Sequence, residues 1–561
     1  MRTIRSGTNI RSLHFPVGAM NDTKMRERRT KSRGEAHMEL FCLFGLVMVG
    51  FTCFAIVMAI RQAGRKQYYP LSTFGTAHFA SSQEAADLLP SPDQLRTQSY
   101  LLLGTYGAQL AALSQKSQES HVLLVAPTGQ GKTSGIMLPG ILTESGHRSL
   151  FINDTKGELI GQCLGWLSKH HQCFVLSPTR PQSSHHYNPL AHVADMEDAE
   201  DVAAALVMNT GESQEPFWDN ASRLLLTAAI LHLKETTAQA PFSSLVQMLT
   251  GSTVADLQQL LLQSPSLLAR AAASSFVQSL SLNERLAGSI MVELATRLYS
   301  MNNPALVAIT SDDEIDFDQF LHTPTAIFLS IPASQAKRLK WFSALFMMQL
   351  MKHLTRRAEE AADKRLARPA ALYLDEFGNQ TIPHFPAYIS LVRSAGIALL
   401  MAIQSHDQLL EAYGEAGKNT ILANATTHIV FPGCGLPETT YYSERLGEMT
   451  VAVISKSYQD TPFSPTTTNY GQAQRRLMTS DEIRRLPTRH LLVITENMAP
   501  CIVRNFAYFE VPQIKQRAGL PYMLPSRMQT PLSQGTLSPG SQPASPGTPQ
   551  PSRNPQQFFL P

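Results

Sequence analysis

The sequence predicts an α/β fold in which a P-loop nucleotide-binding domain carries an all-helical insertion, with one N-terminal transmembrane helix and a disordered C-terminal tail. Three observations lead to this prediction. Short apolar runs alternate with helical stretches along most of the chain. A glycine-rich loop joins one apolar run to a helix-compatible segment. An uncharged stretch near the N-terminus is long enough to cross a bilayer.

The composition of the 561 residues excludes several classes of protein. Hydrophobic residues make up 43%, which is enough for a large core and excludes a wholly disordered or collagen-like chain. The chain has 47 Lys and Arg against 44 Asp and Glu, a net charge of +3, so a nucleic-acid partner would have to bind local basic patches. The six cysteines are scattered without a CxxC pair, which argues against a disulfide framework or a zinc ribbon.

The uncharged stretch Leu40–Ile60 has 21 residues, and a helix of that length spans about 31 Å. The alternatives are a buried helix and a signal peptide. A signal peptide has a shorter apolar region and a small-residue cleavage site, whereas here Arg61 follows at once. We therefore predict a basic segment at residues 1–37, a transmembrane helix at 38–60 and a juxtamembrane connector at 61–98.

The orientation of this helix stays open. Nine basic residues precede the apolar stretch, and only Arg61, Arg65 and Lys66 follow it closely. The positive-inside rule would then place the body of the protein outside the cytoplasm. The predicted nucleotide-binding domain, however, needs the ATP that is found inside the cell. A true start at Met38, or insertion assisted by partner membrane proteins, would each remove the conflict. We expect a single-pass inner-membrane protein with its body in the cytoplasm.

Eight apolar runs are expected as strands of the sheet. They are residues 121–126, 149–153, 173–176, 325–331, 370–374, 397–403, 428–431 and 491–495. We assign the nucleotide-binding domain to residues 99–194 and 321–515. Between them, at 195–320, strand signals vanish and helical periodicity dominates. The expected helices there are residues 200–208, 217–234, 254–262 and 283–300. The predicted tail, 516–561, is rich in Pro, Ser, Gln and Gly and cannot form a core.

The glycine-rich loop predicts a site for ATP and Mg²⁺. Gly129 and Gly131 let backbone N–H groups surround a phosphate without obstruction. Lys132 brings a positive charge to the β- and γ-phosphates, and Thr133 offers its hydroxyl to Mg²⁺. Ala126 stands where the general pattern has Gly. The predicted nucleotide-binding residues are Ala126, Pro127, Thr128, Gly129, Gln130, Gly131, Lys132, Thr133 and Ser134.

A second motif completes the predicted site. The apolar run 370–374 ends in Asp375 and Glu376. Asp375 is positioned to hold Mg²⁺ through water, and Glu376 to polarise the water that attacks the γ-phosphate. Two carboxylates after a strand are common on their own, but the P-loop earlier in the chain favours the functional interpretation.

Several motifs together resemble those of one family. They are Phe74-Gly-Thr-Ala-His-Phe-Ala80, the segment His121–Leu138, Asp154-Thr-Lys-Gly-Glu158, Tyr187-Asn-Pro-Leu190, Phe217-Trp218, Leu374-Asp-Glu-Phe-Gly378 and the run Gln404-Ser405, Gln408-Leu409, Tyr413-Gly414. In them the chain resembles the type IV secretion coupling proteins, also called TraG-type conjugative DNA-transfer ATPases, which belong with the FtsK/HerA-like hexameric pumps. The resemblance covers residues from about 74 to 500. Thr155 replaces a proline of the family pattern.

The resemblance implies a RecA-like nucleotide domain, an all-helical domain that helps to select substrate, and a membrane-anchored homo-hexamer. It implies that Gln404 senses the γ-phosphate. It also implies that Arg393 is an arginine finger supplied by the next subunit, although an ordinary surface arginine is the alternative at this position. The family usually has two membrane spans, whereas one is legible here.

The expected function is an ATPase that couples DNA with a bound relaxase to the membrane proteins of a secretion channel. Two alternatives stay open. One is a motor of the same fold that exports only proteins. The other is a receptor that binds nucleotide without hydrolysing it and recruits partners through its tail. The carboxylate of Glu376 argues against the receptor, which has no need of a group that activates water.

Overall fold

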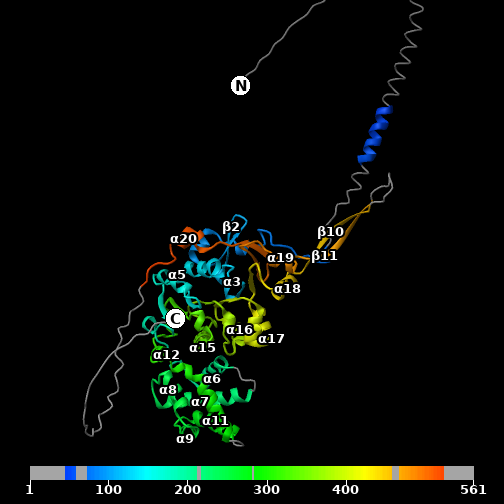
Figure 1. Ribbon diagram of the computed structural model, residues 1–561. Coiled ribbons are helices and arrows are strands. Elements are labelled where there is room, and N and C mark those ends of the chain that lie inside the picture. The colour runs from blue at the N-terminus through cyan, green and yellow to red at the C-terminus, as the bar shows by residue number, and fades with distance from the viewer. Residues whose placement is uncertain (1–44, 59–71, 212–215, 281–283, 458–466, 523–561) are drawn as a thin grey trace, which may run out of the picture. The chain divides into compact units, whose positions relative to one another are not determined.

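The computed structural model describes residues 45–58, 72–211, 216–280, 284–457 and 467–522 (Figure 1). The predicted basic segment and the predicted tail beyond residue 522 lie outside them. The chain divides into two units. The main one contains residues 74–449 together with the described residues from 473 onward. The description below concerns this unit unless stated otherwise.

A mixed sheet of eleven strands forms the centre of the main unit, in the order β2-β1-β13-β12-β9-β3-β8-β7-β4-β6-β5. All eight apolar runs expected as strands form strands. They are β3 (Val122–Val125), β4 (Ser149–Asp154), β5 (Gln172–Leu176), β6 (Thr325–Ser330), β7 (Ala370–Leu374), β8 (Ile397–Ile403), β9 (Thr427–Val430) and β12 (His490–Ile494). The seven from β5 to β9 in the sheet are parallel, with β5 at the edge beside β6. Helices cover both faces of a parallel sheet, which is why these strands are continuous apolar runs.

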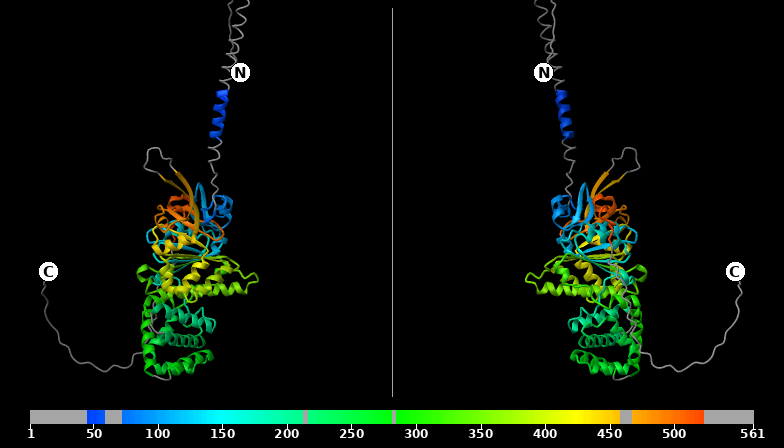
Figure 2. Two further views of the ribbon diagram at one scale, coloured as in Figure 1. Left: turned by 90° about the vertical axis from the view of Figure 1, so that its right-hand side faces the viewer. Right: turned by 90° about the vertical axis from the view of Figure 1, so that its left-hand side faces the viewer.

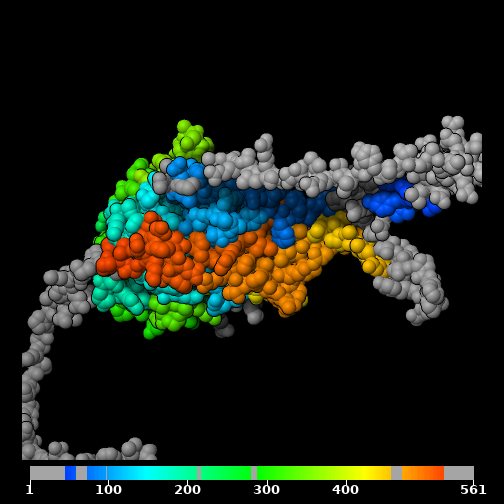
Figure 3. All heavy atoms as spheres, turned by 90° about the horizontal axis from the view of Figure 1, so that it is seen from above, coloured from blue at the N-terminus to red at the C-terminus, as the bar shows by residue number. Residues whose placement is uncertain are grey.

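Three strands that the sequence analysis did not predict extend the sheet at its other edge. They are β1 (Leu101–Tyr106), β2 (Gln109–Leu113) and β13 (Cys501–Arg504), and all pair antiparallel. Gly104 lies where β1 approaches β13, and a Cβ there would be 2.1 Å from the carbonyl oxygen of Arg504. Segments from near the two ends of the body therefore lie side by side, as the blue and orange-red surfaces of Figure 3 show.

Helices pack on the sheet and fill its connections. Those on or near the sheet are η1 (Ala86–Leu88), α2 (Pro92–Thr97), α3 (Gln115–Glu119), η2 (Thr133–Met137), α4 (Leu138–Thr143), α5 (Glu158–Leu167), η3 (Pro181–Ser183), α13 (Gln319–His322), α14 (Ala333–Ala336), α15 (Lys340–Glu360), η5 (Phe377–Asn379), α16 (Phe385–Ser394), α17 (His406–Asn424), α18 (Leu436–Arg445), α19 (Ser480–Arg484), η6 (Tyr508–Glu510) and α20 (Pro512–Lys515). The apolar side chains of both sheet faces are buried beneath these helices and loops.

The connection from β5 to β6 contains a group of helices. They are α6 (Met196–Thr210), α7 (Pro216–Thr236), α8 (Phe242–Gly251), α9 (Val254–Leu262), α10 (Leu267–Leu280), α11 (Glu284–Tyr299), η4 (Ser300–Asn302) and α12 (Pro304–Ile309). Every regular element in the described part of 195–320 is thus helical. Thr253 caps α9 by accepting a hydrogen bond from the Asp256 N–H at 3.2 Å. The green helices gather at one end of the body in Figures 1 and 2.

Two features lie wholly or mostly in the other unit. Residues 45–58 form a helix whose side chains are all exposed, including Leu46, Phe51 and Phe54. The strands β10 (Glu448–Ser457) and β11 (Thr467–Arg476) form a two-stranded sheet. Among the described residues, no helix has the length and apolarity that a membrane crossing requires. Parts of the predicted transmembrane helix lie outside those residues, so it stays a prediction.

Candidate active site

The P-loop connects β3 to η2 and α4, at the carboxyl end of β3. Gly129 and Gly131 have φ angles of +82° and +85°, a left-handed conformation that glycine adopts without steric cost. The Gly135 N–H donates to the Gly131 carbonyl oxygen at 2.8 Å and begins the helix. The loop therefore lies against a helix N-terminus, where free N–H groups and the helix dipole favour a bound phosphate.

Lys132 forms the centre of an ion-pair cluster that joins two predicted motifs. Its side chain is buried, with Nζ 2.7 Å from Glu376 Oε1 and 3.2 Å from Asp375 Oδ1. Both carboxylates follow the last residue of β7, which is separated from β3 by β8 alone. Because all three strands are parallel, their carboxyl ends bring these side chains to one edge of the sheet.

Gln404 follows β8 and joins the same cluster. Its Nε2 donates to Glu376 Oε2 at 2.7 Å, and its Oε1 accepts a hydrogen bond from the Thr128 hydroxyl at 3.3 Å. The Gln404 backbone N–H donates to Gln408 Oε1 at 2.8 Å. The predicted sensor therefore contacts both the P-loop and the predicted base.

The surroundings of Glu376 favour its ionised form. Its burial disfavours the ionised form, but the hydrogen bond from Lys132 and the charge of that ammonium, followed by the hydrogen bond from Gln404, lower the pKa of Glu376 below its ordinary value. Its backbone is left-handed, with φ +54°, which is uncommon for a residue other than glycine. Such a conformation persists where the surroundings impose it, often at functional sites.

Oxygen ligands suited to Mg²⁺ lie beside the cluster. Asp375 is 1% exposed, and its Oδ1 accepts no hydrogen bond from the described residues, although Lys132 Nζ is 3.2 Å away. The side chain of Thr133 is also buried. Carboxylate and hydroxyl oxygens are the donors that this hard cation prefers. The residues present therefore fit the predicted ion.

Asp154 precedes Thr155, the residue that replaces the proline of the family pattern, and it stabilises the local backbone. Its carboxylate accepts hydrogen bonds from the backbone N–H groups of Lys156, Gly157 and Ile160 at 3.2, 2.9 and 2.8 Å, which caps the start of α5. Burial nevertheless raises the pKa of Asp154. The preceding Asn153 donates from Nδ2 to the Asp375 carbonyl oxygen at 3.2 Å and ties β4 to the end of β7.

Arg393 is not brought to the site of its own chain. It lies near the end of α16, just before the first residue of β8, whereas Gln404 follows the last residue of that strand. Its side chain is 43% exposed, and its guanidinium pairs with Glu496 at 3.4 Å. It is therefore at the opposite end of the parallel strands from Lys132. Its predicted action on a neighbouring subunit stays a prediction.

Asn505 supports the P-loop helix from behind, which the sequence analysis missed. Its Nδ2 donates to the carbonyl oxygens of Leu103 and Gly135 at 2.6 and 3.0 Å. A Cβ on Gly135 would lie 2.1 Å from Asn505 Oδ1, so only glycine permits this approach. No local pattern identifies an asparagine whose partners are this remote in sequence.

A comparison with family models identifies the family. The model for "Type IV secretory system Conjugative DNA transfer" matches residues 91–531, most of the chain. The chain belongs to this conjugative DNA-transfer family. The family resemblance inferred from the motifs is thereby confirmed.

Curated relatives agree with this assignment. The chain is 24% identical over 461 residues to a conjugal transfer protein TraG of Escherichia coli, covering 74% of this chain and 71% of the relative. It is 23% identical over 419 residues to the protein VirD4 of Rhizobium radiobacter, covering 71% of this chain and 58% of that relative. The chain thus spans less than two thirds of the VirD4 relative.

Solved structures of the coupling protein TrwB share the fold. An unbound form superposes with a TM-score of 0.59 at 17% identity, covering 78% of this chain and 96% of that one. TrwB in complex with ADP and Mg²⁺ gives a TM-score of 0.58 at 16% identity, with the same coverage. The conjugative DNA-transfer chain described here therefore has the α/β fold of TrwB, with its large mixed sheet.

Proposed function

We propose that this protein is an ATP-hydrolysing motor that couples a substrate, DNA with a bound relaxase, to a type IV secretion channel. The observation that carries the proposal is the convergence of Lys132, Glu376 and Gln404 on the P-loop. A chain that merely stored nucleotide would not need an ionised carboxylate hydrogen-bonded to both the P-loop lysine and a sensor side chain. TrwB, which has the same fold, is known in complexes with ADP and Mg²⁺ and with analogues of ATP and GTP.

The residues divide the work of phosphoryl transfer. The backbone N–H groups of the P-loop and the Lys132 ammonium would bind the β- and γ-phosphates. Thr133 and Asp375 would hold Mg²⁺, which neutralises charge between those phosphates when bound. Glu376 would take the proton of the attacking water, a contribution of about 10²–10⁴ in rate. Gln404, bound to the Glu376 carboxylate, would orient it according to the presence of the γ-phosphate.

The assembly is part of the proposal. We place the body at the cytoplasmic face of the inner membrane, anchored by residues 38–60, as a homo-hexamer. The apolar side chains exposed along residues 45–58 support an anchor. Arg393, remote from its own chain's site and accessible, would complete the site of the next subunit. Arginine fingers supplied in this way contribute about 10³–10⁵ in rate.

The test is ATP hydrolysis by the full chain in detergent, with and without single-stranded and duplex DNA. Lys132→Ala and Glu376→Gln are the controls. A hydrolysis rate per chain that rises with added DNA and with protein concentration, and is lost in both variants, supports a DNA-coupled ring. A rate indifferent to DNA favours export of proteins alone. Tight nucleotide binding without hydrolysis would support the receptor and contradict the motor.

A further inference from the structure

Asn209, near the end of α6, holds the chain that follows Glu376. Its Oδ1 accepts a hydrogen bond from the Thr381 backbone N–H at 3.2 Å, and its Nδ2 donates to the Thr381 carbonyl oxygen at 2.8 Å. The other Nδ2 hydrogen goes to the Ala205 carbonyl oxygen at 2.9 Å, within the helix. The amide is 8% exposed. A flipped amide would set its oxygen against two carbonyl oxygens, so the network fixes its orientation.

These contacts exceed what a helix end requires. The hydrogen bond to Ala205 stays within α6, where that carbonyl is already the acceptor of a backbone N–H one turn later. The two hydrogen bonds to Thr381 instead join α6, in the group of helices between β5 and β6, to the loop after β7. Both partners are buried, and breaking the pair would leave buried polar groups unsatisfied.

The loop held by Asn209, residues 377–384, is tied at its other positions to the nucleotide site. The Tyr413 hydroxyl accepts a hydrogen bond from the Ile382 N–H at 3.2 Å and donates to the Gln380 carbonyl oxygen at 3.4 Å. The ring of Tyr413 also stacks on Phe377, the residue after Glu376. Tyr413 belongs to α17, the helix that carries Gln408, which fixes the predicted sensor Gln404.

The loop approaches α17 closely at Gly378, where there is no side chain. A Cβ at Gly378 would lie 2.5 Å from Cβ of Gln408, so the loop and the helix are in direct contact with no space between them. Packed groups of this kind move together and do not deform independently. We therefore expect a displacement of Glu376 or Gln404 to move the backbone at Thr381.

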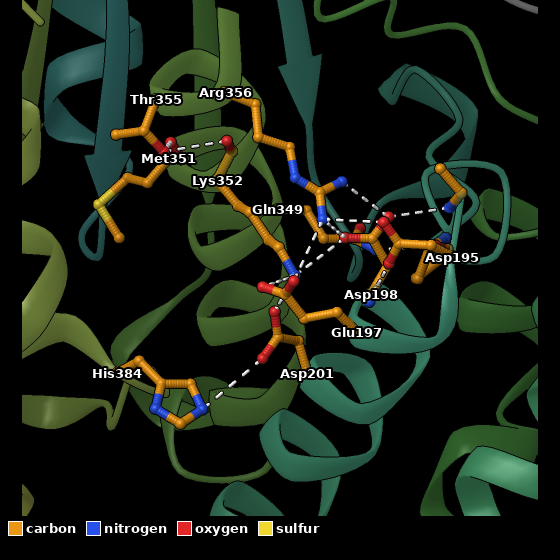
Figure 4. A network of polar contacts seen from close by, with 12 residues as sticks. Asp195, Glu197, Asp198, Asp201, Gln349, Met351, Lys352, Thr355, Arg356 and His384 are labelled. Atoms are coloured by element: carbon orange, nitrogen blue, oxygen red, sulfur yellow. Dashed lines mark hydrogen bonds and ion pairs between the residues drawn. The ribbon is translucent and has the colours of Figure 1, made fainter. Parts of the chain in front are cut away.

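On the other side, α6 is locked to α15 by buried charges (Figure 4). Lys352 of α15 is 6% exposed and lies 3.0 Å from Asp198, with Asp201 as a further partner. His384, the last residue of the loop, has its Nε2 3.6 Å from Asp201 Oδ1. Thus α15 holds α6 at Asp198 and Asp201, and the loop holds α6 at Asp201 and in its last turn.

We propose that residues 377–384 connect the nucleotide site mechanically to α6, and that Asn209 is the positioning residue of this connection. When Glu376 and Gln404 rearrange around the γ-phosphate, the loop carries the movement through Asn209 into the group of helices between β5 and β6. The inference rests on the proposed function, because it requires nucleotide to bind at Lys132.

Hydrogen–deuterium exchange on the full chain in detergent tests this connection, with and without Mg²⁺ and the analogue ATPγS. Two segments are compared, the P-loop at 126–137 and α6 at 196–210. In the wild type we expect ATPγS to change exchange in both, by about fivefold or more, the lower range of usual coupling between sites. In Asn209→Leu, which preserves size and removes all three hydrogen bonds, the P-loop response remains and the α6 response is lost.

Thr381→Val is the matched control, because Asn209 contacts only the backbone of Thr381. It should respond as the wild type does in both segments.

Asn209→Ala serves as the second variant if Asn209→Leu does not fold, and the wild-type comparison needs no variant at all. A P-loop response without an α6 response in the wild type overturns the inference and leaves the proposed function standing. An α6 response that survives in Asn209→Leu or Asn209→Ala overturns it as well. Absence of any P-loop response overturns the proposed function and the inference that rests on it.

Discussion

Replacing Glu376 with glutamine should separate nucleotide binding from hydrolysis. Glu376 Oε1 is 2.7 Å from Lys132 Nζ in a buried setting, so the carboxylate competes with a phosphate for the same ammonium. Removal of the negative charge weakens that competitor without changing its shape. We therefore expect Glu376→Gln to bind nucleotide more tightly and to hydrolyse it more slowly.

The size of the binding effect follows from the hydrogen bond that is weakened. A hydrogen bond to a charged group contributes about 1.5–3 kcal/mol; with both partners charged it lies at the upper end of that range, and with the Lys132 ammonium alone charged it lies at the lower end. The difference is about 1 kcal/mol, which corresponds to about fivefold in affinity. The pKa of Glu376 is lowered, so the wild-type side chain is ionised at pH 7 and the comparison is valid there. Loss of the base should reduce hydrolysis by about 10²–10⁴.

Equilibrium titration with a fluorescent, non-hydrolysable ATP analogue measures the first quantity, and single-turnover phosphate release measures the second. Glu496→Gln is the matched control, because Glu496 is an exposed carboxylate beside Arg393 at the other end of the parallel strands. It should leave the affinity unchanged. Equal or weaker binding by Glu376→Gln would refute the competition between carboxylate and phosphate. A wild-type rate of hydrolysis would refute the assignment of Glu376 as the base.

Three further predictions concern stability and are measured by urea unfolding of the full chain. Gly135→Ala drives a methyl group into Asn505 and should lower the free energy of unfolding by about 1–3 kcal/mol. The control is Gly161→Ala, which has open space around it in α5 and should be neutral or stabilising. Equal effects of the two changes would contradict the close approach of Asn505 to Gly135. Lys352→Met removes the buried ammonium from Asp198 and Asp201, which keep Arg356 and His384 as their remaining basic partners. The change should cost about 3 kcal/mol, the lower end of the cost of breaking a buried pair, and a loss below about 1 kcal/mol would argue against a buried ion pair. Burial and a neighbouring arginine lower the pKa of His428 from 6.5 to about 3, so the unfolded chain binds the extra proton between those values. The unfolding free energy should fall by about 2 kcal/mol from this group between pH 7 and pH 5, and His428→Gln should show a smaller fall; an identical fall in the variant would contradict the assignment.

The parallel strands were predictable because each is a continuous apolar run. The strand β8, with the sequence IALLMAI, is buried along its whole length, and such runs stand out in any sequence. The added edge was not predictable by the same signal. The strand β1 has Gly104 in its middle, and β13 has only four residues, CIVR, so neither shows a strong strand pattern. Their pairing depends on partners remote in sequence.

The same distinction applies to the candidate active site. The P-loop and the Asp375–Glu376 pair are contiguous in sequence, and their residue types indicate phosphate and Mg²⁺ binding, so both could be predicted. Asn209 and Asn505 each make two hydrogen bonds with backbone far along the chain, and an isolated asparagine carries no such signal. Arg393 is a third case, because its predicted role concerns a neighbouring subunit, and a single chain places it at the other end of the parallel strands from Lys132.

The position of β5 at the sheet edge has a consequence for how this architecture can vary. The two strands that flank residues 177–324 are immediate neighbours in the sheet, and a parallel crossover between neighbours needs only about a dozen residues. Nearly all of that connection is therefore dispensable to the strand order. The connection leaves and re-enters the sheet at two neighbouring strands, both on the same side of the strands β3 and β7 that precede Lys132 and Glu376. Its length and surface can therefore change without altering the strand order, as long as contacts such as those of Lys352 and Asn209 are kept.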